Sequence, residues 1–399
     1  MKIRLLLALL LINLAFIPAV AGIRARSAMV PLTLDHNRII IRVGVYLPNG
    51  AIKQVNAWVD NGTPDLSITE RLAKELGLMP ANDKGAVKPP EKIQIGGLPI
   101  VIKNLKQPIE IVKGPTVGPG LEAEINLPSA VLCNYDVVID YPGRQFTIGS
   151  PGSIYFVGKA VKGFFNPQNH LIQISGKVDG QSFNLALDAG TPVTFIAAGL
   201  VSNWSKAHTS WPSAHGAIGI ANLWGLDDEP DWQLLRINKM ECGGLIFPDM
   251  IAVSFPADRL AYFQKRAGIT TAGLMGAASL LNYRVGIDYT HETVYFQRIG
   301  KSVEVDMSLV GLILRPEADG RYSILGVSRY DGRPSVPGVL KGDILLKVND
   351  KNVTGLTMGK TWSLLHGNPG TSYTLTIERA GKQLTVNAKA HRFLCNHPV

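Results

Sequence analysis

Cysteine is scarce in this sequence, with only three among 399 residues. Because Cys133, Cys242 and Cys395 are odd in number and far apart, we expect no disulfide framework. Metal-ligand patterns are also lacking, since the eight histidines show no paired spacing. His208 and His215 are expected at the surface of a loop, and the sequence predicts neither a metal nor another cofactor.

Long apolar runs are missing except at the N-terminus. Lys2 and Arg4 precede an apolar stretch over residues 5–17, and residues 18–21 (PAVA) form a small-x-small cleavage site. The stretch is shorter than the roughly 20 residues of a spanning helix, which disfavours an uncleaved membrane anchor. We therefore predict a signal peptide at residues 1–21, no membrane segment after its removal, and an exported protein that is periplasmic or secreted. Independence from disulfides is compatible with a bacterial envelope.

Clustered positive charge is lacking as well. The formal net charge of +9 becomes +7 (9 − 2) once Lys2 and Arg4 are removed, and the other basic residues are scattered. No run resembles a nucleic-acid-binding stripe, so no nucleic-acid partner is expected. Roughly 375 mature residues exceed what one hydrophobic core usually serves, which predicts two or three domains.

A short sequence occurs twice, as WVDNGTP at residues 58–64 and ALDAGTP at residues 186–192. The aspartates of the two copies, Asp60 and Asp188, are 128 residues apart (188 − 60). Each ends an apolar, strand-like run and enters a turn that contains glycine, an arrangement that holds a carboxylate rigidly at a cleft. Two such turns facing each other would form a carboxylate pair.

The duplication extends beyond these turns. In both copies, a predicted hairpin ends at the aspartate. A short helix is predicted after the first aspartate turn, and a tight Gly-Gly turn comes next in each copy. Both copies then share an N-Y-x-V-x-I-D-Y segment. The hairpin strands are residues 39–43 with 55–59 and 171–174 with 183–187, the helix is 69–77, the Gly-Gly turns are 96–97 and 243–244, and the shared segments are 134–141 and 282–289. Four landmarks in one order predict two duplicated lobes. Asp140 and Asp288, at the ends of the shared segments, are interpreted as structural carboxylates.

The second copy contains about 19 extra residues, because the offset grows from 128 at the aspartates to 147 (243 − 96) at the Gly-Gly turns. The extra length falls within residues 204–232, which are rich in glycine and tryptophan. Two interpretations stay open. The segment either folds over a cleft as a hairpin, or it is a surface loop whose tryptophans pack on the lobe.

From about Val303 the pattern predicts a separate module of about 90 residues. Its central feature is residues 336–350, followed by a helix near 358–366 and strands near 373–378 and 383–388.

The Asp-x-Gly-Thr turns, the later apolar-Gly segment and the strand ending in Ile-Asp-Tyr resemble the retropepsin-like and pepsin-like aspartic proteases. The C-terminal stretch resembles a PDZ domain of the permuted bacterial type. Together they resemble exported bacterial aspartyl proteases with a C-terminal PDZ domain. The resemblance implies a mostly β fold with two acid-protease-like β-barrel lobes, at residues 30–150 and 151–300, and a PDZ domain at 303–392.

This resemblance implies an aspartic-type endopeptidase that acts on proteins or peptides. Asp60 and Asp188 would share a proton and activate a water, without a cofactor. One chain supplies both aspartates, so a monomer is expected. The residues expected to support the turns are Gly62, Thr63, Gly190 and Thr191.

For the PDZ-like module, the resemblance implies capture of a peptide carboxylate by backbone amides near Gly311, Leu312, Ile313 and Leu314. The alternative is a packing module that orients the protease.

The sequence departs from the family pattern at two places. Where the family has Thr or Ser after each catalytic aspartate, this chain has Asn61 and Ala189. Asn61 can still form a bond across to the other lobe, whereas Ala189 has no side chain to do so. In addition, residues 272–277 keep the apolar-Gly signature, but residues 125–130 contain no glycine. A weak or inactive peptide-binding scaffold therefore remains the alternative function.

Overall fold

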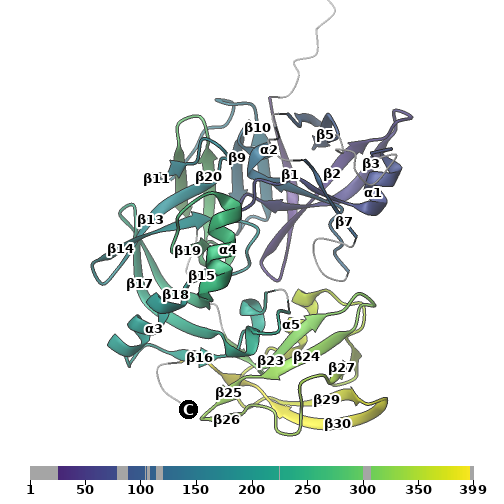
Figure 1. Cartoon of the computed structure of the whole chain (residues 1–399), viewed down its shortest axis with the longest axis vertical. Coiled ribbons are helices and arrows are strands. Elements are labelled where there is room, and N and C mark those ends of the chain that lie inside the picture. Colours follow the sequence, from purple (N-terminus) through teal and green to yellow (C-terminus); the bar gives the residue numbers. More distant parts are fainter. Residues whose placement is uncertain are drawn as a thin grey trace, which may run out of the picture.

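The computed structural model describes residues 26–78, 89–103, 105, 108–113, 120–223, 225–299 and 307–395, and the protein is mostly β. Figure 1 shows the first copy of the repeat at the upper right, the second at the left, and the C-terminal module below both. Within the described part of the chain, no helix combines the length and apolar character needed to cross a membrane. The predicted signal peptide, residues 1–21, lies outside the described residues.

A sheet of 13 strands contains the first copy and part of the second. Its first-copy strands are β1 (Ser27–Asp35), β2 (Arg38–Tyr46), β3 (Ile52–Asp60), β4 (Ser67–Thr69), β5 (Lys92–Ile95), β6 (Leu98–Val101), β7 (Glu110–Val112), β8 (Ile125–Pro128), β9 (Asp136–Asp140) and β10 (Gln145–Gly149). The second copy adds β11 (Lys159–Lys162), β20 (Tyr283–Asp288) and β21 (Thr293–Arg298). Helices α1 (Glu70–Glu75) and α2 (Ser129–Leu132) follow β4 and β8.

A sheet of eight strands holds the rest of the second copy. Its strands are β12 (Phe164–Phe165), β13 (Ile172–Val178), β14 (Gln181–Leu187), β15 (Thr194–Ala197), β16 (Ser213–His215), β17 (Gln233–Cys242), β18 (Leu245–Phe255) and β19 (Gly273–Met275). Helix α3 (Ala198–Ala207) follows β15, and α4 (Ala257–Ala267) follows β18.

Both copies repeat one strand order. The run β2-β3-β8-β4-β7 corresponds to β13-β14-β19-β15-β18, and the four pairings in each run are antiparallel, parallel, antiparallel and parallel. Strands β9 and β20 join the copies by antiparallel pairing centred on Val138 and Gly286. These two residues are 148 positions apart (286 − 138), which equals the offset of the shared segments (282 − 134), so equivalent strands of the two copies pair about a pseudo-two-fold axis.

The local predictions in these copies are confirmed. β2 pairs with β3 and β13 with β14 as hairpins that end at the aspartates. The Thr69 hydroxyl caps α1 by accepting a hydrogen bond from the Leu72 amide. Both Gly-Gly turns have positive φ at each glycine, which explains the residue type in such tight hairpins. The three cysteines are free.

Asp140 and Asp288 are structural, as predicted. The Asp140 carboxylate accepts a hydrogen bond from the Gly143 amide at 2.7 Å, and Asp288 accepts one from the His291 amide at 2.9 Å. Each carboxylate therefore closes the turn that follows its strand.

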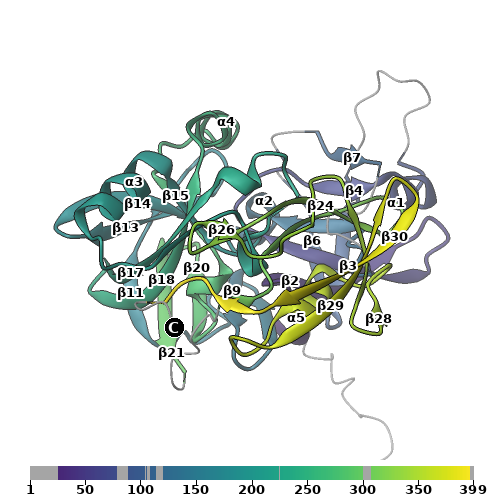
Figure 2. The ribbon, with the colours of Figure 1, turned by 90° about the horizontal axis from the view of Figure 1, so that it is seen from below.

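The C-terminal module contains a six-stranded sheet and has its own hydrophobic core. The sheet strands are β23 (Leu312–Pro316), β24 (Tyr322–Val327), β27 (Ile344–Val348), β28 (Lys351–Asn352), β29 (Ser372–Arg379) and β30 (Lys382–Lys389). Figure 2 shows strands β24, β29 and β30 of this sheet from below. Short pairs form from β22 (Ser308–Leu309) with β31 (His391–Arg392) and β25 (Arg329–Tyr330) with β26 (Arg333–Pro334). Helix α5 (Met358–Leu365) and strands β29 and β30 confirm the elements predicted there.

Candidate active site

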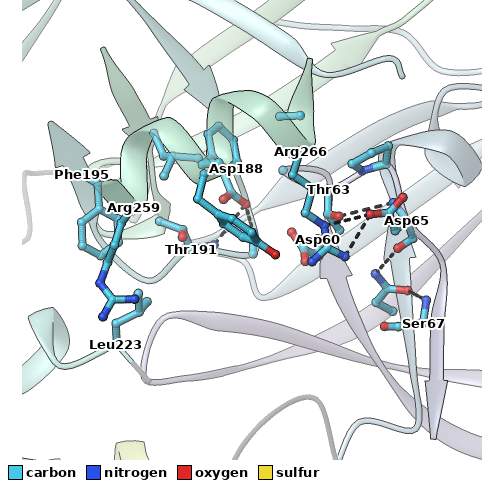
Figure 3. Close-up of a pocket in the computed structure, with 18 of the residues that line it drawn as sticks. Asp60, Thr63, Asp65, Ser67, Asp188, Thr191, Phe195, Leu223, Arg259 and Arg266 are labelled. Atoms are coloured by element: carbon cyan, nitrogen blue, oxygen red, sulfur yellow. Dashed lines mark hydrogen bonds and ion pairs between the residues drawn. The ribbon is translucent and has the colours of Figure 1, made fainter. Parts of the chain in front are cut away.

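The repeated turns bring Asp60 and Asp188 into one cavity (Figure 3). Asp60 is the last residue of β3, and Asp188 directly follows β14. The parallel partners β8 and β19 fix these strand ends, since Asp60 lies opposite Pro128 and the Asp188 amide donates to the Met275 carbonyl at 3.0 Å. Both aspartates are 7% exposed. Each carboxylate is thus held at the end of a strand that is paired on both sides.

Each carboxylate lies against the glycine of the opposite turn. A Cβ added at Gly62 would be 2.1 Å from the Asp188 Cγ, and one added at Gly190 would be 2.3 Å from the Asp60 Oδ1. Neither glycine has a positive φ. Glycine is needed at both positions because the opposite carboxyl group occupies the space of a side chain.

Burial sets the protonation of this pair. It raises the pKa of Asp60 well above its usual value, and the nearby Asp188 charge raises it further. Burial also raises the pKa of Asp188, against the stabilising donors Gly190 and Thr191, whose amides reach the Asp188 Oδ1 at 2.8 and 3.2 Å. Each carboxyl group lies against the turn that carries the other, so the two influence each other's charge and titrate in coupled steps. The Gly190 and Thr191 amides stabilise the ionised form of Asp188, so the proton of the pair is held by Asp60.

Asn61 ties the two turns together, as its chemistry predicted. Its Nδ2 donates to the Leu187 carbonyl at 3.1 Å, and its Oδ1 accepts from the Ala189 amide at 2.7 Å. The side chain is buried, with 1% of its surface exposed. Ala189 contributes only its backbone, so the side-chain bond between the copies comes from one side.

Replacing Asn61 by Ala will therefore weaken the fold. The Leu187 carbonyl and the Ala189 amide would lose these partners while buried, which we expect to lower the free energy of unfolding by about 2–4 kcal/mol. Urea denaturation measures this change. Asn61→Thr is the matched control, because one hydroxyl can donate to Leu187 and accept from Ala189. An Asn61→Ala protein as stable as the wild type would contradict this role.

The two threonines support the turns through different atoms. The Thr191 amide donates to the Asp188 Oδ1 at 3.2 Å, whereas the Thr63 Oγ1 accepts from the Asp65 amide at 3.3 Å. Their carbonyls act alike, because Thr63 accepts from the Ser129 amide and Thr191 from the Ala277 amide, both at 2.9 Å. The missing glycine at residues 125–130 therefore leaves this supporting bond in place.

The aspartates open into a cavity of about 780 Å³. Its walls are largely apolar and include Phe195, Leu223, Phe255, Phe263 and Leu274. Helix α4 contributes one wall, and it carries the charged residues Arg259 and Arg266 into the lining. The cavity has the size of a site for a peptide or small organic ligand.

Arg266 spans this cavity and was not found by the sequence analysis. From α4 in the second copy, its Nε donates to the Asp65 carboxylate at 3.0 Å and its Nη2 to Glu110 at 2.9 Å, both in the first copy. A neighbouring cavity of about 540 Å³ is lined by the same three residues. The sequence does indicate the helix, since residues 257–267 lie between Pro256 and Gly268. It contains no pattern that places the helix against Asp65.

Residues 204–232 combine features of the two interpretations left open above, a hairpin over a cleft and a loop whose tryptophans pack on the lobe. Leu223 and Leu226 line the cavity, while apolar residues within 214–223 share a hydrophobic core with both the second copy and the C-terminal module. Trp204, Trp211 and Trp232 are buried, and Trp224 lies outside the described residues. His215 is exposed and His208 is half-buried against Trp211, so the prediction of surface histidines holds for His215 and in part for His208. No group of three metal-ligating side chains occurs in the described part of the chain.

The residues expected to capture a peptide carboxylate lie at the start of β23. Gly311 has a φ of +89°, and Leu312, Ile313 and Leu314 are all buried. Ile313 packs in a hydrophobic core shared with residues 214–223. A peptide could reach Ile313 only if that segment moved.

Comparison with known proteins gives structural likenesses but no family. No protein-family model and no curated protein matches the chain. Among solved structures, the chain is similar to the aspartic proteinase from Irpex lacteus, with 14% sequence identity, a TM-score of 0.38, and coverage of 69% of this chain and 98% of that chain. The chain is thus mostly β with an aspartic proteinase as a distant structural neighbour.

Proposed function

We propose that this chain is an aspartic-type endopeptidase that hydrolyses peptide bonds in proteins or peptides, with Asp60 and Asp188 as its catalytic residues. The observation that carries the proposal is the buried pair of carboxyl groups, each against the glycine of the opposite turn, in the lining of one largely apolar cavity. In this proposal, residues 30–150 and 151–300 are two lobes of an aspartic protease, and residues 303–392 are a PDZ domain. The protein would be exported as a monomer after loss of residues 1–21.

The chemistry follows from the protonation of the pair. Ionised Asp188 takes a proton from a water molecule, and the water oxygen bonds to the carbonyl carbon of the substrate. Protonated Asp60 donates to the carbonyl oxygen and stabilises the charge that develops there. The tetrahedral intermediate then collapses as the C–N bond breaks. The proton held by Asp188 passes to the leaving nitrogen, and the proton on the former carbonyl oxygen returns to Asp60, which restores the pair.

The alternative is a peptide-binding scaffold without hydrolysis, which does not require the carboxyl groups to touch. Their close approach, buried in one cavity, supports the enzyme. Asn61 also supplies the bond between the turns that the family obtains from a hydroxyl, so this departure does not favour the scaffold.

A transition-state analogue tests the proposal. A peptide with a tetrahedral hydroxyl-bearing carbon in place of the scissile carbonyl should bind at least about 10²-fold more tightly than the matching peptide, because enzymes bind transition states best. Calorimetry of both ligands measures this, and Asp60→Asn should remove the difference. Equal affinities for the two peptides would favour the non-catalytic scaffold.

Replacing Arg266 by Ala should move the pH dependence of cleavage. The positive charge of Arg266 lowers the pKa of Asp60, so its removal raises that pKa. Because Asp60 must hold its proton, the alkaline limb of kcat/KM will shift to higher pH. Arg266→Lys keeps the charge and should keep most of the wild-type profile. An unchanged alkaline limb in Arg266→Ala would show that this charge does not act on the pair.

A further inference from the structure

A segment of the second copy covers one face of the C-terminal module. We call residues 213–223 and 225–232 the bridging segment. Strand β23 is the outer strand of its sheet, and the end of α5 lies beside it, since the Val310 amide donates to the Leu365 carbonyl at 3.0 Å. Ile218 and Ile220 of the bridging segment share a hydrophobic core with Leu309 and Ile313 of the module. The outer face of β23 is therefore already covered by this chain.

Three glycines let the bridging segment approach so closely. A Cβ at Gly216 would lie 2.8 Å from Ile313 Cδ1, one at Gly219 would lie 2.3 Å from Trp362 Nε1, and one at Gly225 would lie 2.6 Å from Arg315 Cα. All three glycines have positive φ. Since no side chain fits at these points, the segment and the face formed by β23 and α5 are complementary in shape.

Polar contacts hold the same interface. Asp227 pairs with Arg315 at 3.2 Å and lies 3.9 Å from Lys341 of the module. The Ser328 hydroxyl donates to the His215 carbonyl. Within the segment, the fully buried Glu229 accepts hydrogen bonds from the amides of Leu223 at 3.3 Å and Leu226 at 3.0 Å. The segment thus has a defined shape, and Asp227 places a negative charge beside Arg315 and Lys341 of the module.

The bridging segment also reaches the aspartate cavity. Leu223 and Leu226 belong to the cavity lining. The first copy is also hydrogen-bonded to this segment. His36 is bonded to the Gly219 carbonyl at 2.8 Å, and Arg38 donates to the Leu223 carbonyl. A displacement of the segment from the module would therefore move part of the cavity wall.

We propose that the bridging segment is an internal ligand of the C-terminal module, occupying the face formed by β23 and α5. An external peptide of similar apolar character competes with it for that face, and its binding releases Leu223 and Leu226 at the cavity. This assignment depends on the contacts of the segment and not on peptide hydrolysis.

The test uses a synthetic peptide with the sequence of residues 214–226 and a variant whose internal ligand is dislodged. Gly219→Ala places a Cβ against Trp362, whereas Gly180→Ala is matched, with a positive φ but no atom within 4 Å of its Cβ. Labelled peptide should bind Gly219→Ala at least tenfold more tightly than the wild type or Gly180→Ala, and a scrambled peptide should not bind. Equal affinity for all three proteins, or no binding to Gly219→Ala, would overturn the proposal.

Hydrogen–deuterium exchange checks the same point without a ligand. In Gly219→Ala, exchange should rise together in residues 216–226, 309–316 and 358–365, while β29 and β30 stay protected and show that the module is folded. Faster exchange confined to residues 216–226 would contradict the assignment, because an emptied face must also become more exposed.

Discussion

Asp60→Asn and Asp188→Asn will each abolish peptide cleavage, with kcat reduced on the order of 10²–10⁴-fold or more. An amide at position 188 cannot take a proton from water, and an amide at position 60 cannot give one to the carbonyl oxygen. Asp60 and Asp188 are buried together, and each influences the protonation of the other. Neither carboxyl group alone can therefore replace the pair. Steady-state rates on a defined peptide across acid to neutral pH measure the loss.

A stability measurement shows that the Asp60→Asn protein is folded and that the pair is coupled. The pKa of Asp60 is raised in the folded state above its usual 3.8. At pH values between 3.8 and the raised pKa, the folded protein therefore binds more protons than the unfolded chain. The wild type should therefore lose stability as pH rises through that window, and Asp60→Asn should lose less. Either variant retaining more than a tenth of the wild-type kcat would contradict the catalytic assignment.

Gly62→Ala and Gly190→Ala will reduce cleavage on the order of 10²-fold, because a displacement of about 1 Å at a catalytic group has an effect of this size. The added methyl groups would lie 2.1 Å from Asp188 Cγ and 2.3 Å from Asp60 Oδ1, so the carboxyl groups must separate. Overpacking should also lower the free energy of unfolding by about 1–3 kcal/mol. Rates and urea denaturation measure the two effects.

Gly199→Ala is the control for these substitutions. Gly199 lies in α3, its φ is not positive, and no atom lies within 4 Å of its added Cβ. This variant should cleave at the wild-type rate. A Gly62→Ala protein with the wild-type rate would show that the carboxyl groups need not be held in contact.

Much of the aspartate site could be predicted because its signals are local and repeated. The strand, the Asp-x-Gly-Thr turn and the following elements occur twice within short stretches, and hairpin register places each aspartate at a strand end. The bond from Asn61 across to the second turn followed from the donors and acceptor of its side chain. The reason for Gly62 and Gly190 did not follow, because it depends on the carboxyl group of the other copy.

The contacts that sequence reasoning missed are all long-range. Arg266 meets Asp65 and Glu110 from positions 201 and 156 residues away, and no local pattern encodes that distance. The bridging segment was recognisable as extra length, but its partner surface on β23 and α5 was not. Glycines at 216, 219 and 225 were visible in the sequence, yet only the structure shows that they face the C-terminal module.

Cleavage of a peptide mixture by the folded wild-type protein, from acid to neutral pH with products identified by mass spectrometry, is the most direct measurement of the central claim. We predict internal cleavage products over the pH range in which the Asp60–Asp188 pair holds one proton. The absence of products at every pH, from protein whose folding is verified, would contradict hydrolysis by this pair and favour a non-catalytic peptide-binding protein.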